Sequence, residues 1–370
     1  IGYASIPNVL ETVSKKDVSK GLGKYELLKI DLANKADTDN AVIHASPDIV
    51  IHLAAESHVD RSIDGPEVFI YSNIIGTFNL LESSRNYWNK LDTRSKENFR
   101  FQHISTDEVF GSLGETGSFE EKTSYDPRSP YSASKASSDH LVRSWHHTYG
   151  LPILISNCSN NFGPWQFPEK LIPLSILKSC LKEPIPIYGD GKNVRDWLFI
   201  EDHIDALLLI ANKGKVGESY CIGGQGEKNN KEVVIKICEI MDRFYPDNAP
   251  HQNLIQYVKD RPGHDKRYSI NPQKIKEELG WIPKYTFNEG LEKTVKWYLN
   301  NLNCLIKVII KKKLSDIDSA IESYEKAIEL NPEYVDAVCN LGICFVSQKK
   351  HKEAIHVYEK ADRLNPDRWE

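Results

Sequence analysis

Short apolar segments that alternate with longer amphipathic ones constrain the fold of this chain more than any other feature. Residues 47–55, 101–105 and 152–157 are almost continuously apolar, as expected for strands that are buried on both faces. Segments with helical spacing follow at 67–88 and 131–149. Because parallel strands need a crossover helix between them, this alternation predicts an α/β fold with a doubly wound parallel sheet.

The length of the predicted elements and the composition of the loops change after Asn161. Residues 1–161 carry the alternation of strands and helices, with a further strand expected at 25–32. Residues 162–300 have shorter segments and loops rich in Pro and Gly, which indicates a smaller α+β lobe interleaved with the first domain. We expect this lobe to close over the carboxyl edge of the sheet, where ligands of open α/β sheets bind.

The end of the chain carries an internal repeat. After a linker at 301–314, the sequence AIELNP, which ends at Pro332, returns as ADRLNP, which ends at Pro366. The repeated prolines are 34 residues apart, which is the period of the tetratricopeptide repeat. Residues 315–370 therefore resemble a short all-α repeat tail, which either packs on the main domain or belongs to a larger array that binds a partner protein.

Composition excludes several classes of function. A net charge of −5 over 370 residues gives no reason to expect binding to nucleic acid or to a membrane surface. No apolar run has the length of a membrane span, and no secretory leader is recognisable at Ile1. The seven cysteines form no CxxC pair, which favours a reducing, cytoplasmic location. No cluster has the spacing of metal ligands, so we expect no metal site.

Two stretches carry residues suited to catalysis. The strand at 101–105 runs into Thr106, Asp107 and Glu108. Two adjacent carboxyl groups in one pocket push their pKa values apart, which can supply one acid and one base. A solvated pair in a loop is the alternative for these two residues, and the second stretch decides against it.

The second stretch predicts a tyrosine and a lysine on one face of a helix. Ser129 and Pro130 form a typical helix start. Tyr131 and Lys135 are then four residues apart, so their side chains can meet. Because a nearby cation favours phenolate, we expect Lys135 to lower the pKa of Tyr131 and to make it a base near neutral pH.

These motifs identify a family. Residues 1 to about 300 resemble the nucleotide-sugar 4,6-dehydratases of the extended short-chain dehydrogenase/reductase family, which have a Rossmann-type sheet. The likeness rests on HLAAESHVDRS at 52–62, STDEVF at 105–110, SPYSASKASSDHL at 129–141, NCSNNFGP at 157–164, FPEKLIP at 167–173, RDW at 195–197 and DRPGHD at 260–265.

One departure concerns the start of the chain. The family opens with a strand, a Gly-rich phosphate loop and a helix, and none of these is recognisable after Ile1. We therefore expect the first βα unit to be missing, and with it the helix N-terminus that would bind the cofactor pyrophosphate. This expectation makes the activity of the chain uncertain at the level of sequence.

The resemblance implies an activity and a role for each residue of the two stretches. The family removes water from carbons 5 and 6 of a nucleotide-linked glucose while NAD is reduced and reoxidised. Tyr131 would take the proton of the carbon-4 hydroxyl, with Thr106 bonded to the same oxygen and Lys135 holding the ribose. Glu108 would remove the carbon-5 hydrogen. Asp107, protonated, would help the carbon-6 hydroxyl to leave.

The resemblance also implies binding residues, a dTDP-linked sugar as the substrate and a homodimer. Arginines such as Arg195 and Arg261 suit the phosphate oxygens, which they can bind with two parallel donors. The implied cofactor-binding residues are Asp31, Leu32, Leu53, Ala54, Ala55, Ser72, Tyr131, Lys135 and Asn161. The implied substrate-binding residues are Ser57, Thr106, Asn160, Lys170, Leu171, Ile185, Ile187, Arg195, Asn230, Arg261 and His264.

Three alternatives stay open. A nucleotide-sugar epimerase or a UDP-glucuronate decarboxylase would keep the tyrosine and lysine, but neither needs the acid at Asp107. A UDP-glucose 4,6-dehydratase would differ only in the base of its substrate. In the third alternative, the sheet domain is inactive and the repeat tail makes the chain an interaction protein. The expected loss of the phosphate loop favours this alternative, and the complete catalytic motifs argue against it.

Overall fold

The computed structural model describes residues 26–301 and 335–364, together with isolated positions at 321, 324, 325, 328 and 332. It divides into two compact units, the first ending at Asn300 and the second continuing from Asn301. The predicted loss of the first βα unit concerns positions before residue 26 and stays an expectation. None of the helices in these ranges is long and apolar enough to cross a membrane.

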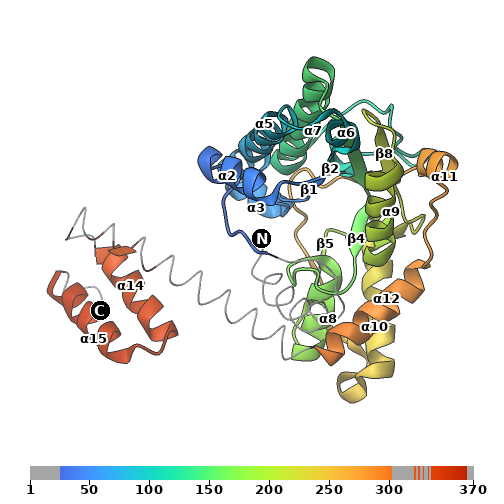
Figure 1. The fold of residues 1–370 in the computed structure, drawn as a ribbon. Coiled ribbons are helices and arrows are strands. Elements are labelled where there is room, and N and C mark those ends of the chain that lie inside the picture. The colour runs from blue at the N-terminus through green and yellow to red at the C-terminus, as the bar shows by residue number, and fades with distance from the viewer. Residues whose placement is uncertain are drawn as a thin grey trace, which may run out of the picture. The chain divides into compact units, whose positions relative to one another are not determined.

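A four-stranded parallel sheet lies at the centre of the first unit (Figure 1). Its strands are β1 (Ile49–His52), β2 (Arg100–Thr106), β3 (Ile153–Cys158) and β8 (Ser219–Ile222), in the order β1-β2-β3-β8. His52 lies opposite His103, and Thr106 lies opposite Cys158. The predicted doubly wound parallel sheet is confirmed.

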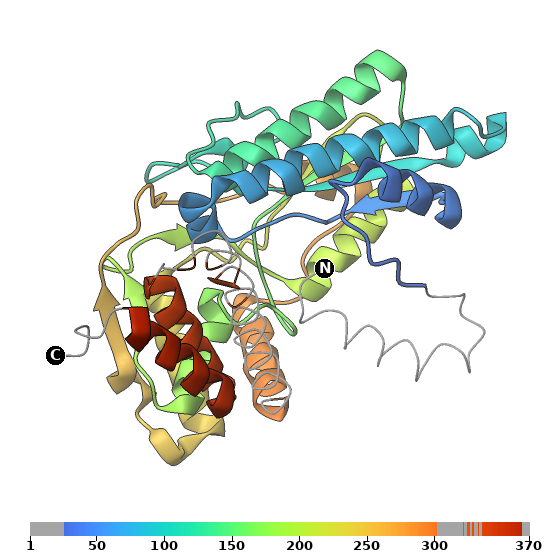
Figure 2. The ribbon, with the colours of Figure 1, turned by 90° about the vertical axis from the view of Figure 1, so that its left-hand side faces the viewer.

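Strands β2, β3 and β8 are buried on both faces, as expected for apolar strands of a parallel sheet, whereas Ile49 and Ile51 of β1 are more than a third exposed. Phe101, Ile153 and Ile155 pack in one core cluster with residues of α5 (Gly76–Trp88) and α7 (Pro130–Tyr149). Ile104 and Leu154 pack in another cluster with residues of α9 (Ile200–Lys213). Figures 1 and 2 show α5 and α7 side by side, and Trp145 of α7 donates a hydrogen bond to Glu82 of α5 (2.8 Å).

The predicted long helix at 67–88 is divided into several segments. A π-helix at Ile70–Ile75 precedes α5, and Asn73 within it donates a hydrogen bond to Ser134 of α7 (2.8 Å). The other elements of this part are α2 (Lys35–Ala45), α3 (Val59–Asp64), α4 (Pro66–Phe69), α6 (Thr93–Asn98) and a short 3-10 helix at Asp107–Phe110.

The strand expected at 25–32 is wrong for the residues that the structure describes. Residues 26–30 have no regular secondary structure, and Asn34 N donates to Asp31 O (2.9 Å) in a turn. The side chain of Asn34 then caps α2. A strand needs a neighbour to complete its ladder, and no strand in the described part of the chain pairs with this segment.

Residues 160–300 are built from short elements, as the sequence predicts for this part of the chain. Apart from β8, their strands form three pairs: β4 (Asn160–Phe162) with β7 (Trp197–Phe199), β5 (Ile185–Tyr188) with β10 (Ile255–Val258), and β6 (Val194–Arg195) with β9 (Lys228–Asn229). Their helices are α8 (Leu171–Leu181), α9, α10 (Asn230–Phe244), α11 (Gln273–Leu279) and α12 (Phe287–Asn300), with short 3-10 turns at Pro246–Asn248 and His251–Leu254.

In the second unit, α14 (Val335–Ser347) and α15 (His351–Leu364) form a helical hairpin. Val338, Cys339 and Ala361 are buried between them. Gly342 lies directly against the ring of Tyr358: a Cβ atom at position 342 would come within 2.6 Å of that ring. A small residue facing a large one across the hairpin agrees with the predicted repeat.

Candidate active site

The start of α7 places Tyr131 and Lys135. Ser129 caps the helix, and its hydroxyl accepts a hydrogen bond from Ser132 N (3.0 Å), while the Ser132 hydroxyl accepts one from Ser129 N (3.0 Å). This capping box fixes the first turn. Tyr131 and Lys135 are both buried on the face of α7 that packs toward β2.

The carboxyl end of β2 supplies the opposite set of residues. The hydroxyl of Thr106 accepts a hydrogen bond from Glu108 N (3.3 Å) and so begins the short 3-10 helix. The same hydroxyl donates to Asp107 Oδ1 (3.2 Å). Thr106 also affects the pKa of the Tyr131 phenol, so it lies close to both the tyrosine and the pair of carboxyl groups.

All five predicted catalytic residues line one cavity of about 370 Å³. The two stretches named by the sequence therefore face each other, although the role of each residue stays a prediction. The cavity is lined by Leu53, Ala55, Ser57, Ile104, Ser105, Thr106, Asp107, Glu108, Tyr131, Lys135, Cys158, Ser159, Asn160, Asn161, Gln166, Lys170, Ile200 and His203.

The two carboxyl groups have different surroundings. Burial, followed by the charges of Glu108 and Asp196, raises the pKa of Asp107 well above its ordinary value. Burial also raises the pKa of Glu108, but Lys170, Arg261 and Arg195 oppose that rise. Asp107 is therefore the better candidate for a protonated acid and Glu108 for a base, as the sequence predicts.

The expectation that the pKa of Tyr131 is lowered toward neutrality is wrong. Burial and the charge of Glu108 raise the pKa of Tyr131 well above its ordinary value, and the bond from Thr106 lowers it only in part. Lys135 Nζ instead donates to the backbone oxygen of Ile104 (2.7 Å). Burial lowers the pKa of Lys135 itself. Helical spacing correctly predicted that the two side chains share one cavity, but it did not predict the direction of the pKa shift of Tyr131.

A buried carboxylate that the sequence reasoning missed lies one turn beyond Lys135. Asp139 Oδ2 accepts hydrogen bonds from Ser105 Oγ (2.7 Å) and Tyr125 Oη (2.8 Å), and Asp139 Oδ1 lies 3.2 Å from His103 Nε2. Burial alone would raise the pKa of Asp139, but these partners and Lys135 hold it below its ordinary value. The i+4 spacing after Lys135 was the signal in the sequence.

Several predicted substrate-binding residues surround the cavity. Lys170 Nζ donates to Ser57 O (2.9 Å), and both residues line it. Arg195 Nη2 donates to Asp265 O (3.0 Å), and Arg261 Nη1 donates to Asp60 Oδ1 (3.1 Å). These two arginines do not line the cavity, but their charges act on Glu108 within it.

Other predicted residues lie elsewhere. Ile185 and Ile187 are fully buried in a core cluster with Val234 and Cys238, and Leu171 packs against that cluster. His264 lines a separate cavity of about 530 Å³. Outside the catalytic cavity also lie Asp31, Leu32, Ala54, Ser72 and Asn230. The binding roles of all these residues stay predictions.

The cavity also contains residues that the sequence reasoning did not name. Cys158, Gln166 and His203 line it. His203 lies in the first turn of α9, which begins at Ile200, and its position in the cavity followed only from the tertiary fold. Burial raises the pKa of the Cys158 thiol to about 12, which makes it a poor nucleophile. Within the described ranges, no three His, Cys, Asp or Glu residues could hold a metal ion.

Comparison with known families divides the chain at the same place as the structure. The family described as GDP-mannose 4,6 dehydratase matches residues 4–294. Two repeat families, TPR repeat and tetratricopeptide repeat, match residues 310–346 and 335–368. The predicted tetratricopeptide tail is therefore confirmed.

Individual relatives agree with this division. A dTDP-glucose 4,6-dehydratase of Xanthomonas campestris pv. campestris is 55% identical over 284 residues, which are 76% of this chain and 81% of that protein. A dTDP-glucose 4,6-dehydratase of Escherichia coli is 57% identical over 265 residues, 69% of this chain and 73% of that protein.

Solved structures are similar as well. A double mutant of dTDP-glucose 4,6-dehydratase from Streptomyces venezuelae, with NAD bound, has a TM-score of 0.72 and 36% identity and covers 82% of this chain and 86% of its own. The Bacillus anthracis dTDP-glucose 4,6-dehydratase in complex with NAD has a TM-score of 0.68 and 35% identity, over 83% and 96% of the two chains.

Proposed function

This chain belongs to the GDP-mannose 4,6 dehydratase family, and on that premise we propose that it dehydrates dTDP-glucose to the 4-keto-6-deoxy sugar nucleotide with NAD as its cofactor. The observation that carries the proposal is the cavity itself. It joins a buried tyrosine and lysine to two carboxyl groups of unequal pKa. An epimerase has no use for the buried acid at Asp107.

The residues of the cavity fit NAD. Leu53 and Ala55 offer small apolar walls for a flat ring, and the side-chain oxygen of Asn161 is buried without a protein partner in the described part of the chain. NAD would accept the hydride and return it. Lys135 spends one of its three donors on Ile104 O, which leaves two for the ribose hydroxyls.

Each side chain then has a defined task on the sugar. Tyr131 would take the proton of the carbon-4 hydroxyl in its phenolate form, which burial disfavours and which the positive charge of the oxidised nicotinamide ring of bound NAD would favour. Thr106 would bond the same sugar oxygen. Once carbon 4 is a ketone, the neighbouring carbon-5 hydrogen is acidic, and Glu108 removes it. Asp107 gives its proton to the carbon-6 hydroxyl, which leaves as water. The hydride taken from carbon 4 would then return to carbon 6, and Glu108 would return its proton to carbon 5, which gives the 4-keto-6-deoxy sugar. Lys170, Arg195 and Arg261 supply positive charge for the diphosphate, as their effect on Glu108 indicates.

The experiment that tests the proposal is Asp107→Asn in the full chain, with dTDP-glucose and NAD. Amide replaces acid, so water loss should slow by about 10²- to 10⁴-fold. Oxidation at carbon 4 should change little, so NADH absorbance should build up before the keto sugar forms. Asp126→Asn, at an exposed aspartate, is the control. Equal slowing of both steps would show that Asp107 is not the acid.

The base of the nucleotide needs its own measurement. We compare kcat/KM for dTDP-glucose and UDP-glucose with the same enzyme. We expect dTDP-glucose to be preferred, because the relatives from Xanthomonas campestris and Escherichia coli described above carry that name. Equal or better use of UDP-glucose would assign the chain to the second alternative while leaving the catalytic residues unchanged.

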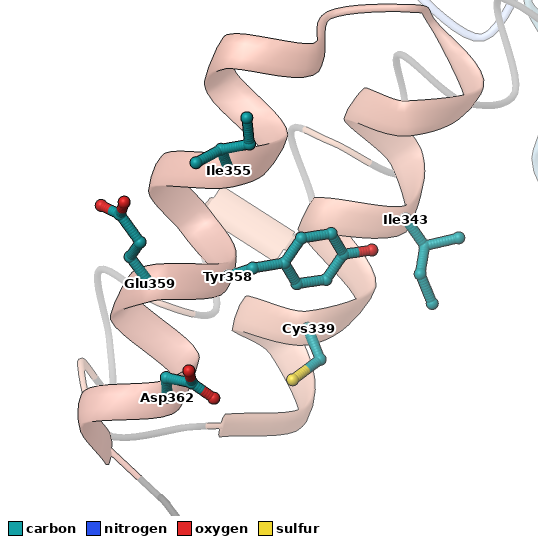
Figure 3. Close-up of a pocket in the computed structure, with 6 residues that line it drawn as sticks. All are labelled: Cys339, Ile343, Ile355, Tyr358, Glu359 and Asp362. Atoms are coloured by element: carbon teal, nitrogen blue, oxygen red, sulfur yellow. The ribbon is translucent and has the colours of Figure 1, made fainter. Parts of the chain in front are cut away.

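We also propose a homodimer, a cytoplasmic location and a protein partner for the tail. The tail has a cavity of about 600 Å³ lined by Cys339, Ile343, Ile355, Tyr358, Glu359 and Asp362 (Figure 3). Ile343 and Ile355 are more than half exposed beside it, and Tyr358 points from α15 toward α14. Light scattering tests the homodimer, and a monomer at working concentration would exclude the homodimer.

Crosslinking tests the protein partner of the tail. The crosslinked products of the full chain are compared with those of a chain truncated at Asn300, and identical products would exclude a partner bound by the tail.

A further inference from the structure

Six buried polar atoms of residues that line the catalytic cavity have no hydrogen-bond partner among the described residues. Asp107 Oδ2 and Asn160 Oδ1 belong to residues already assigned to the substrate, and Ser159 Oγ lies beside the Asp196 carboxylate. The other three are Asn161 Oδ1, Gln166 Oε1 and His203 Nε2. The imidazole of His203 belongs to a residue that is only 4% exposed. A buried polar atom left unpaired destabilises a protein by about 1–3 kcal/mol, so a group of three calls for a ligand.

The fold brings these atoms to one wall. β4 carries Asn161 and pairs in parallel with β7, where Leu198 lies opposite Asn161. β7 continues directly into α9, so His203 stands in the first turn after the strand. Gln166 follows β4, and its backbone oxygen accepts a hydrogen bond from Tyr298 Oη (2.6 Å). Asn161 and His203 therefore lie on regular elements, and Gln166 lies in the loop that follows β4.

The hydrogen bonds of the two amides fix which end of each is free. Gln166 Nε2 donates to Asn161 O (2.8 Å). Asn161 Nδ2 donates to Ser159 O (3.3 Å) and lies 3.2 Å from Cys158 Sγ. Both amide nitrogens are thus used within the protein, and both amide oxygens are left as acceptors.

The third atom has a different capacity. Burial lowers the pKa of His203 to about 4, so the ring is neutral at pH 7 and carries one N–H. With that proton on Nε2, the wall offers two acceptors and one donor. A phosphate or carboxylate would face two carbonyl oxygens and is disfavoured. A sugar hydroxyl has only one proton to give to two acceptors.

A primary carboxamide matches this set, because it has two N–H donors and one carbonyl acceptor. Resting on the proposed use of NAD, we propose that Asn161, Gln166 and His203 form a clamp for the carboxamide of the nicotinamide ring. The two amide oxygens accept the NH₂ group, and His203 Nε2 donates to the carboxamide oxygen. Holding the carboxamide fixes which face of the ring is turned toward the sugar. Gln166 and His203 are therefore cofactor-positioning residues.

The test measures binding rather than turnover, by calorimetry on the full chain. Three dinucleotides are compared: NAD, its 3-acetylpyridine analogue, in which a methyl replaces the NH₂ group, and its nicotinic acid analogue, which bears a carboxylate. We expect wild type to bind NAD about tenfold more tightly than the acetylpyridine analogue, since one well-placed donor group is lost. The nicotinic acid analogue should bind most weakly.

Two variants assign the contacts. Gln166→Met removes an acceptor, so it should weaken NAD binding by about fivefold to tenfold and reduce the preference over the acetylpyridine analogue toward one. His203→Leu should weaken both by similar factors, because both keep the carbonyl. His203→Gln, which retains an N–H near the position of Nε2, should restore binding. Gln252→Met and His147→Leu, at exposed positions, are matched controls, and thermal melting shows that each variant is folded.

The outcomes separate the clamp from the proposed function. NAD binding with an unchanged preference in Gln166→Met, or a nicotinic acid analogue that binds as tightly as NAD, overturns the clamp alone. A folded wild-type chain that binds none of the three dinucleotides overturns the use of NAD, and the clamp falls with it. Loss of the preference in Gln166→Met with rescue by His203→Gln supports the clamp.

Discussion

The two units of the chain bury different kinds of side chain. Around the catalytic cavity, Asp107, Lys135 and Asp139 are almost completely buried. In the α14–α15 hairpin, the buried side chains that the structure describes are apolar, such as Val338 and Ala361. Burying an ionisable group is unfavourable unless partners compensate it. The first unit therefore contains buried groups that are unfavourable for stability but suited to catalysis. The buried side chains of the second unit are only those that the packing of a helical repeat requires.

The comparison predicts that some buried polar groups serve the reaction and not the fold. Tyr131→Phe removes one hydroxyl and keeps a ring that packs edge-on against Phe69 (ring centroids 6.3 Å apart). Without its proton acceptor, turnover should fall by about 10³-fold, while the melting temperature changes little. Turnover and thermal melting are measured together, with the exposed Tyr149→Phe on the same helix as control. Retained turnover in Tyr131→Phe would remove the tyrosine from the mechanism.

Asp139 should show the opposite behaviour, with a large effect on stability. Asp139→Asn leaves Lys135 without its buried counter-charge and removes a charged acceptor from Ser105 and Tyr125. Removal of one partner from a buried charged network destabilises by about 3–5 kcal/mol, which urea unfolding at pH 7 measures. Asp205→Asn, at an exposed ion pair, is the control.

The pH dependence gives Asp139 a second test. Its folded pKa is lowered, so its contribution is present above the unfolded value of about 4 and is lost as pH falls through the folded value. The difference between Asp139→Asn and wild type should therefore shrink in acid. A difference that is small at pH 7, or that grows as pH falls, would contradict this role.

Local signals predicted the parts of the site that depend on neighbours in the chain. Ser129 and Pro130 predicted the start of α7, and therefore that Tyr131 and Lys135 lie on the same face of this helix. The apolar strand before Thr106 announced the carboxyl edge of the sheet. These elements follow from capping and periodicity, which a sequence displays directly.

Contacts between distant segments were not predictable in this way. Lys135 donates to Ile104 O, 31 residues away, and burial and the charge of Glu108 raise the pKa of Tyr131 that helical spacing alone predicted to fall. His203 reaches the cavity only because β7 pairs with β4. The apolar spacing at 25–32 resembled a strand, but a strand also needs a neighbour, which no local pattern supplies.

The buried residue His103 predicts that the stability of the first unit depends on pH. Burial, followed by the charge of Lys135, lowers the pKa of His103 to about 4 in the folded protein. The unfolded chain therefore binds more protons below pH 6.5, so stability is complete above that pH and falls toward pH 4. Between pH 6.5 and 5, His103 alone should remove about 2 kcal/mol from the free energy of unfolding. His103→Gln should flatten the profile, and an unchanged slope would assign the acid sensitivity to other groups.

The hairpin of the second unit should respond to volume and not to charge. A Cβ at Gly342 would come within 2.6 Å of the Tyr358 ring, so Gly342→Ala should force the two helices apart. Overpacking of this kind destabilises by about 1–3 kcal/mol, and the higher helix propensity of alanine returns up to about 1 kcal/mol. We expect a net loss of about 1 kcal/mol, confined to this unit, with no change in turnover. Hydrogen exchange of α14 and α15 measures this loss of stability, and Ser347→Ala on the exposed face of α14 is the control.

A double variant tests the cause. Because the clash is steric, Gly342→Ala combined with Tyr358→Leu should recover the protection of α14 and α15 against hydrogen exchange. If the double variant exchanges faster than Gly342→Ala alone, the tyrosine stabilises the hairpin through contacts other than its fit against the glycine.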